Sequence, residues 1–166
     1  MIQRIQSLWL LLASLSCFLL FFSPVATFMP NPECDINAKE LIFKFFAYRL
    51  DYELPFSEIL DGLYAPFLQW TVVVVVLVCI LTPFFAIFMY KSRMRQMQLS
   101  RLTILLNIAL TVSFFLLSDF FAEGKCVIVR YSVGIYVPIA AVVFLLLAIR
   151  FIKKDDKLVR SADRIR

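Results

Sequence analysis

The sequence predicts an α-helical polytopic membrane protein, a four-transmembrane-helix bundle with a small extracytoplasmic β-element. Hydrophobic residues make up 62% of the chain, whereas about 45–50% is usual in soluble domains. Apolar runs near residues 7–29, 67–90, 102–121 and 133–152 are each long enough to cross a bilayer. We therefore expect residues 1–166 to form a single four-span membrane domain.

The distribution of positive charge predicts the orientation of these spans. The inner loop, residues 91–101, carries the cations Lys91, Arg93, Arg95 and Arg101 and no acid. Short connections of this kind stay on the cytoplasmic side, because Lys and Arg are held back from translocation. Both termini are then cytoplasmic, and residues 30–66 lie outside. This asymmetry also accounts for the net charge of +5, so no nucleic-acid partner is expected.

The first apolar run has a second interpretation. Arg4 precedes an apolar stretch from Leu8 to Met29, and a basic start followed by apolar residues is also typical of a cleaved signal peptide. The stretch is longer than a signal sequence needs, however, and no A-x-A-like cleavage site follows it. We therefore predict a retained first span.

The outer segments predict short strands. Residues 48–54 and 124–132 alternate apolar with polar or charged side chains, which is the pattern of half-exposed strands. Residues 41–46 fit either a partner strand or an interfacial helix, and their periodicity leaves both open. We expect the strand within 124–132 to pair with strands from the outer loop 30–66.

Two spans carry patterned residues that favour helix contacts. Thr103, Asn107 and Thr111 recur every four residues on one face of the third span. This face predicts interhelical hydrogen bonds, with a ligand site as the alternative. Small residues at positions 134, 141 and 148 of the fourth span predict a seam where a neighbouring helix approaches closely.

The cytoplasmic tail, residues 153–166, is a candidate interaction segment. Its helical spacing places Leu158, Arg160, Ala162 and Ile165 in position to dock on a membrane-protein partner. The alternative is a basic anchor attracted to anionic lipid. Acids interrupt the tail and weaken a purely lipid-directed role. We also expect these acids to contact the N-terminal hexapeptide through Arg4.

Two cysteines, Cys34 and Cys126, fall in the outer segments. In an oxidising compartment exposed cysteines tend to pair, which predicts a disulfide between the two outer loops. The layout also loosely resembles quinone-linked thiol oxidases and vitamin K reductases, four-span proteins with outer cysteines. Electron relay in such proteins typically uses a C-x-x-C pair with a lowered thiol pKa, and this chain contains no C-x-x-C.

Both ends of the chain resemble a known family. The start, MIQRIQSLWLLLA, and the end, KKDDKLVRSADRIR, together resemble a Bacteroidetes-type family of four-span membrane proteins, domain of unknown function family 4293. Members often read Ala-Asn-Arg where this chain has Ala148, Ile149 and Arg150. The resemblance implies the four-span fold and a location in the bacterial inner membrane. It implies no activity.

These observations favour a non-enzymatic assembly or accessory component of the inner membrane. The chain has no histidine, and no Asp, Glu, Lys or Arg lies in the middle of a predicted span, so we expect no catalytic residues, cofactor or metal site. The expected partners are the lipid bilayer and a membrane protein that binds the tail, and oligomerisation is compatible with both. The alternative is a transporter or channel subunit, followed by a thiol–quinone oxidoreductase.

Overall fold

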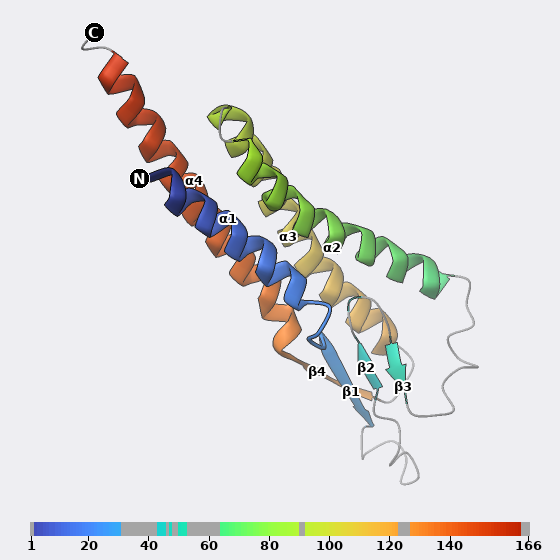
Figure 1. Ribbon diagram of the computed structural model, residues 1–166. Helices are drawn as coiled ribbons and strands as arrows, with labels where there is room; N and C mark the ends of the chain where they lie inside the picture. Colours follow the sequence, from blue (N-terminus) through green and yellow to red (C-terminus); the bar gives the residue numbers. More distant parts are fainter. Residues whose placement is uncertain are drawn as a thin grey trace.

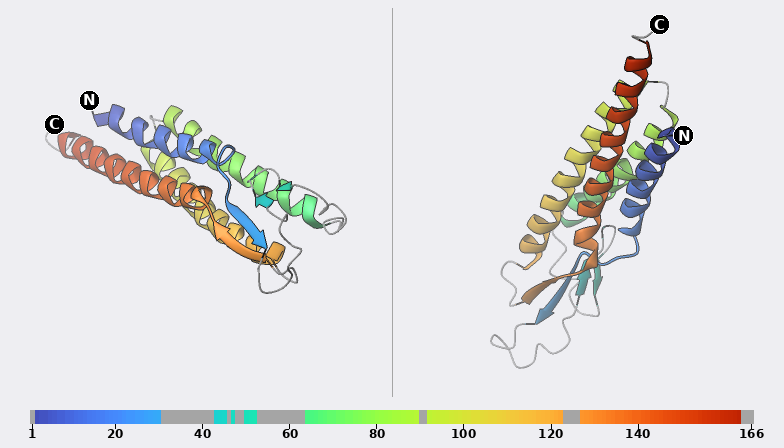
Figure 2. Two further views of the ribbon diagram at one scale, coloured as in Figure 1. Left: turned by 90° about the horizontal axis from the view of Figure 1, so that it is seen from below. Right: turned by 90° about the vertical axis from the view of Figure 1, so that its left-hand side faces the viewer.

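Four helices lie side by side in one elongated bundle, and a small sheet covers one of its ends (Figures 1 and 2). The computed structural model describes residues 2–30, 43–45, 47, 50–52, 64–89, 92–122 and 127–163. The helices are α1 (Ile2–Leu19), α2 (Tyr64–Phe88), α3 (Arg93–Ala122) and α4 (Val137–Asp163), the last preceded by the 3₁₀ turn η2 (Val133–Tyr136). The strands are β1 (Ala26–Pro30), β2 (Phe43–Phe45), β3 (Leu50–Tyr52) and β4 (Val127–Tyr131).

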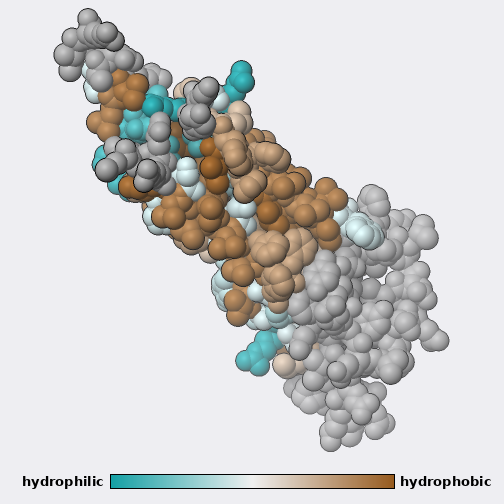
Figure 3. Space-filling model, in the orientation of Figure 1, coloured by the Kyte–Doolittle hydropathy of each residue, from teal (hydrophilic) through white to brown (hydrophobic). Residues whose placement is uncertain are grey.

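Among the described residues, three helical segments are long and apolar enough to cross a membrane. They are Trp70–Phe88, Arg93–Phe120 and Val133–Val159, and a shorter apolar helix covers Ile5–Leu19. Apolar side chains dominate the middle of the molecule's visible face, and polar side chains gather where the two chain ends lie (Figure 3). By length and composition, the architecture fits a membrane protein.

The predicted first span is wrong in its extent. We expected residues 7–29 to cross the membrane, but α1 begins at Ile2 and ends at Leu19, and β1 begins at Ala26. Pro24 explains the break, because proline cannot donate to a helical hydrogen bond and disfavours helical geometry in the residue before it. The apolar residues that follow form the strand β1, and their backbone groups find hydrogen-bond partners in β2 on one side and β4 on the other.

The connection between α2 and α3 is shorter than predicted. We expected residues 91–101 to form an inner loop, whereas α3 already begins at Arg93. The Ser92 carbonyl accepts the backbone N–H of Gln96 at 3.0 Å, so the helical hydrogen bonding starts there. The residues that follow are Arg, Met, Gln and Leu, all good helix formers. The cations of the predicted loop therefore lie largely on the first turns of α3.

The sheet is antiparallel, with the strand order β3-β2-β1-β4. Phe43–Phe45 forms a strand, so the described part of residues 41–46 takes the strand alternative. Our expectation for the second outer strand was half right. It forms at Val127–Tyr131, but among the described strands it pairs with β1, of which only Pro30 belongs to the predicted outer loop 30–66. Its partner was hidden in the sequence because β1 continues an apolar run.

The fourth helix continues well beyond its apolar part. We expected the tail to be helical, and α4 runs without interruption to Asp163. Its last turns project past the other helices at the end opposite the sheet (Figures 1 and 2). We call residues 153–163 the α4 extension.

The predicted small-residue seam lies in the core. Ala141 and Ala148 are fully buried. The N–H of Gly134 donates to the carbonyl of Pro24 at 3.0 Å, and a Cβ atom at Gly134 would lie 2.5 Å from that same oxygen. The seam therefore holds α4 and η2 tightly against α1 and the turn that follows it.

Candidate functional site

The polar face of α3 points into the bundle. Thr103 and Asn107 are fully buried, and Thr111 is half-buried. Thr103 donates to the Leu99 carbonyl, and Thr111 donates to the Asn107 carbonyl, both at 2.9 Å. These hydroxyl bonds stay within α3, so the two threonines do not join α3 to a neighbouring helix.

Among the described residues, Asn107 makes the interhelical hydrogen bond of this face. The Cys17 thiol of α1 donates to Asn107 Oδ1 at 3.4 Å, and Asn107 Nδ2 donates to the Thr103 carbonyl at 2.9 Å. Cys17 packs with Cys79 of α2 and Ala141 of α4, so all four helices meet near this point. Sequence reasoning identified Asn107 but missed Cys17, because a cysteine in an apolar run carries no periodic signal.

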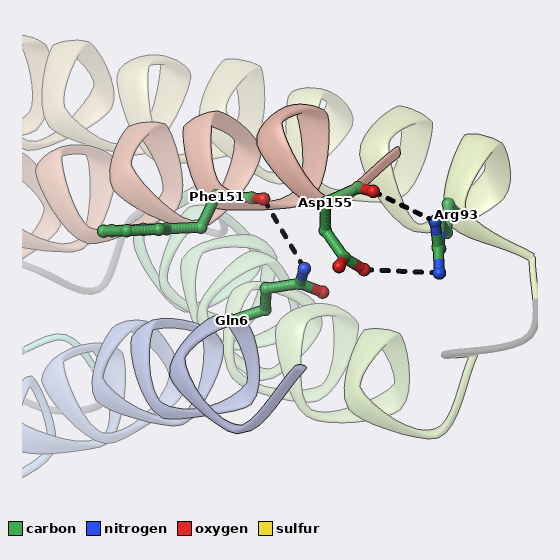
Figure 4. A network of polar contacts seen from close by, with 4 residues as sticks. All are labelled: Gln6, Arg93, Phe151 and Asp155. Carbon is green, nitrogen blue, oxygen red and sulfur yellow. Dashed lines mark hydrogen bonds and ion pairs between the residues drawn. The ribbon is translucent and has the colours of Figure 1, made fainter. Parts of the chain in front are cut away.

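A second polar site lies at the end of the bundle opposite the sheet (Figure 4). Arg93 of α3 reaches α4, where its Nη2 lies 3.3 Å from Asp155 Oδ2 and its Nη1 donates to the Asp155 carbonyl at 3.3 Å. Gln6 of α1 donates its amide to the Phe151 carbonyl of α4 at 3.5 Å. We call Gln6, Arg93 and Asp155 the polar clasp, since together they join three helices.

The clasp is partly shielded from solvent. Asp155 is 8% exposed and Gln6 is 5% exposed, while the Arg93 side chain is 22% exposed. Asp155 Oδ2 accepts no hydrogen bond from the described residues, although it lies at ion-pair distance from Arg93. We conclude that attraction between charges, rather than hydrogen-bond geometry, holds this carboxylate.

The clasp bears on the expected contact between the N-terminal hexapeptide and the tail. The hexapeptide does contact α4, through Gln6 and the Phe151 carbonyl. The cation beside Asp155 is Arg93, which sequence reasoning placed in a loop. The Arg4 side chain lies outside the described part of the chain, so its predicted pairing stays a prediction.

The α4 extension presents apolar side chains to solvent. Leu158 is 47% exposed and Val159 is 40% exposed. Arg160 and Ala162 belong to the same helix, but their side chains fall outside what the structure describes, as do Ile165, Cys34 and Cys126 entirely. The predicted disulfide and three of the four residues of the predicted docking set therefore remain predictions.

The end of α3 next to the sheet carries a third polar group. Tyr131 of β4 stacks edge-on with Phe115 of α3, with ring centroids 4.9 Å apart. Partial burial raises the pKa of Tyr131, and the charge of Asp119 and a hydrogen bond to it act in the same direction. Beside Asp119 lies an open hollow lined by Leu116, Phe120 and Ala122. Within the described ranges, no three His, Cys, Asp or Glu side chains are grouped to hold a metal ion.

Comparison with known proteins places the chain by family. Neither a curated protein nor a solved structure matches it. The model of the family described as "Domain of unknown function (DUF4293)" matches residues 2–165, which is nearly the whole chain. The chain therefore belongs to this family of unknown function.

Proposed function

We propose that the chain is a four-span protein of the bacterial inner membrane and a non-enzymatic assembly or accessory component, which holds a partner protein through its α4 extension. The partner is a membrane protein or a protein bound at the membrane surface. The proposal has three parts: the number of spans, their orientation and the docking surface.

The contacts between α1 and α4 support a fourth span. Gln6 touches Phe151 at one end, and Pro24 touches Gly134 at the other. From Gly134 to Phe151 the helix rises about 26 Å over 17 residue steps, close to the roughly 30 Å of the hydrocarbon core. The chain from Gln6 to Pro24 runs alongside that length, so α1 would lie at the same depth as the apolar part of α4.

The charges at the two ends of the bundle support the orientation. Arg93 and Asp155 bring the start of α3 and the α4 extension to one end, and both segments are rich in Lys and Arg. That end would remain in the cytoplasm, because cationic connections resist translocation. The sheet would then lie on the outer side.

A labelling experiment tests this topology. We expect an impermeant thiol reagent to label Ser57→Cys in intact cells and to spare Ser92→Cys until the cells are permeabilised. Both substitutions would be made in a background without the native cysteines. Labelling of Ser92→Cys but not Ser57→Cys in intact cells would contradict the orientation.

The observation that carries the docking proposal concerns the packing face of α4. This face continues beyond the point where the other helices of the bundle cover it. Ile152 is fully buried against the bundle and Asp155 is 8% exposed, yet Val159, on the same face, is 40% exposed. Leu158 beside it is also exposed. Apolar side chains projecting into water gain free energy when a partner covers them.

The interior of the bundle favours this proposal over transport. Transport pathways use polar groups that a substrate or ion can reach. The Asn107 amide instead donates a hydrogen bond within its own helix and accepts one from the Cys17 thiol. The Ser118 hydroxyl likewise donates to the Phe114 carbonyl within α3. These buried groups contribute to packing and leave little capacity for a passing solute.

Site-specific photo-cross-linking tests the docking surface. A photoreactive phenylalanine analogue at Val159 should yield one discrete adduct in native membranes, and the same analogue at exposed Ser161 should yield much less. The double change Leu158→Gln/Val159→Gln should abolish stoichiometric co-purification of the captured protein, whereas the control Ser161→Gln should retain it. An adduct of twice the chain mass would identify a second copy as the partner. No adduct at Val159 would contradict the proposal.

A further inference from the structure

Four cations of α4 occupy the helix face that points away from the bundle. Arg150, Lys153, Lys154 and Lys157 follow the i, i+3, i+4, i+7 spacing of one face, and all four are exposed. The opposite face of the same turns carries Ile149, Ile152 and Asp155, which are buried. The cations therefore make no part of the helix packing.

The cationic face continues a stripe of apolar side chains. Ile139, Val143 and Leu146 precede Arg150 on this side of α4, and each is about half exposed. In the topology proposed above, these apolar residues face lipid chains. The change from apolar to basic at Arg150 then marks the boundary of the hydrocarbon core.

The depth of the cations matches the headgroup layer. Arg150 adjoins Phe151, whose carbonyl is level with Gln6 at the start of α1. From Arg150 to Lys157 the helix rises about 10 Å, and the headgroup region of one leaflet is roughly 5–8 Å thick. The four side chains would thus span the phosphate layer from its inner to its outer surface.

We propose that the face formed by Arg150, Lys153, Lys154 and Lys157 binds anionic phospholipid headgroups of the inner leaflet. The inference rests on the proposed membrane insertion, which the thiol labelling above tests separately. The lipid phosphate accepts charge-assisted hydrogen bonds from the lysines and from the Arg150 guanidinium. Bound lipid orients the α4 extension at the membrane surface, and the opposite face stays free for a protein.

The position of this face favours lipid over a protein or nucleic acid as its occupant. The cations are continuous with the lipid-facing stripe, so a soluble macromolecule would have to displace the headgroups already there. Juxtamembrane Lys and Arg are attracted to anionic lipid, each strengthening the attraction about fivefold. The two faces of the extension therefore have different partners.

The protein contains its own reporter for this binding. Trp9 packs against Phe144 and Phe151 of α4, with ring centroids 5.9 and 6.3 Å away. The other tryptophan of the chain is Trp70, which is 69% exposed on α2. The change Trp70→Phe leaves Trp9 as the single tryptophan, next to the cationic turn, and excitation at about 295 nm selects it over the six tyrosines.

Fluorescence quenching tests the proposal with the full chain in vesicles. The Trp70→Phe protein is reconstituted in phosphatidylcholine mixed with phosphatidylglycerol, and either lipid carries brominated chains. We expect brominated phosphatidylglycerol to quench Trp9 at several-fold lower mole fraction than brominated phosphatidylcholine. The preference should largely disappear at 1 M salt, where the Debye length falls to about 3 Å.

Charge-matched variants separate a specific face from net charge. The double change Lys153→Gln/Lys154→Gln should reduce the preference by up to about 25-fold, about fivefold for each lysine, and Lys153→Arg/Lys154→Arg should retain it. The control Lys44→Gln/Arg130→Gln removes the same charge from the sheet, where Lys44 of β2 and Arg130 of β4 lie on either side of Thr27 of β1. This control should leave the preference unchanged. Equal quenching by the two lipids would overturn the proposal. So would an equal loss in the sheet control, or a loss of preference in the arginine variant that still folds.

Discussion

At the scale of single residues, close contacts decide what the chain tolerates. Gly134 is the clearest case, because its missing side chain lets η2 meet the turn after α1. The Gly134 N–H donates to the Pro24 carbonyl, and that oxygen occupies the space where a Cβ atom would stand. The contact needs a residue without a side chain in η2 and the proline-induced turn between α1 and β1.

We predict that Gly134→Ala destabilises the protein by about 1–3 kcal/mol, the usual cost of overpacking a tight site. The backbone atom in the way cannot rotate aside as a flexible side chain would. Thermal unfolding in detergent measures the change. Val133→Ala is the control, because Val133 is 68% exposed and its truncation should cost less. A melting temperature for Gly134→Ala equal to that of the wild type would contradict the observed packing.

We also predict that the pKa of Tyr131 lies above the ordinary tyrosine value, which is about 10. Partial burial is the main cause, followed by the charge of Asp119 and its hydrogen bond. Stability from this neutral phenol is fully present below the ordinary pKa and is lost as the pH rises through the raised one. Asp119→Asn should lower the pKa of Tyr131 part of the way back.

Tyrosinate absorbance against pH measures this titration. Subtracting the Tyr131→Phe curve isolates the signal from the other five tyrosines of the six in the chain. If the Tyr131 curve does not move in Asp119→Asn, the carboxylate does not act on the phenol.

At the scale of elements, the polar clasp fixes how far the helices slide past one another. Arg93 holds both the carboxylate and the main-chain carbonyl of Asp155, so it joins the first turn of α3 to α4 at one height. Gln6 does the same for α1. Apolar packing alone tolerates such sliding more readily, because it has no directional preference.

We predict that Arg93→Gln destabilises the protein by about 1–3 kcal/mol, because the shielded Asp155 carboxylate loses its counter-charge. Arg93→Lys should recover only part of this, since an ammonium group lacks the fork that reaches two acceptors. The matched control is Arg95→Gln, two residues along and exposed, which should stay within about 0.5 kcal/mol. Thermal unfolding of the three variants side by side provides the measurement, and equal losses at both positions would count against the clasp.

At the scale of the whole molecule, the two ends have different chemistry. The sheet end brings together β1, which follows the first helix, and β4, which precedes the last one. The other end carries the clasp and the α4 extension. Cys34 and Cys126, beyond the described residues, belong to the segments that directly follow β1 and precede β4 in the sequence.

We predict a Cys34–Cys126 disulfide in the mature protein, worth about 2–4 kcal/mol because it closes a long loop of the unfolded chain. Alkylation of freshly isolated membranes followed by mass spectrometry of non-reduced peptides provides the measurement. Cys17 and Cys79 serve as internal controls, since both are free and buried in the bundle. Free thiols at both outer positions would end this prediction.

The sequence alone predicts much of this architecture. Hydrophobic runs located α2, α3 and α4 because helices in a bilayer must be long and apolar. Four-residue spacing correctly placed Thr103 and Asn107 inside the bundle, and seven-residue spacing placed Ala141 and Ala148 in the seam. The period-2 pattern identified β3 and β4. All of these patterns involve residues close together in the sequence, so they can be recognised without knowledge of distant contacts.

Only the tertiary structure decided the remaining features, since they depend on pairing between distant segments. Residues 26–30 are apolar enough to continue a span, and they form a strand because β4, about 100 residues further along the chain, supplies their hydrogen-bond partners. Arg93 lies in a cationic stretch that fits a solvated loop, and it pairs with Asp155 because the fold brings α3 against α4. Cys17 carries no pattern of its own, and it bonds Asn107 because α1 and α3 meet inside the bundle. Local sequence sets helix, strand and burial, whereas the pairing of distant backbone and charged groups is settled only when the chain has folded.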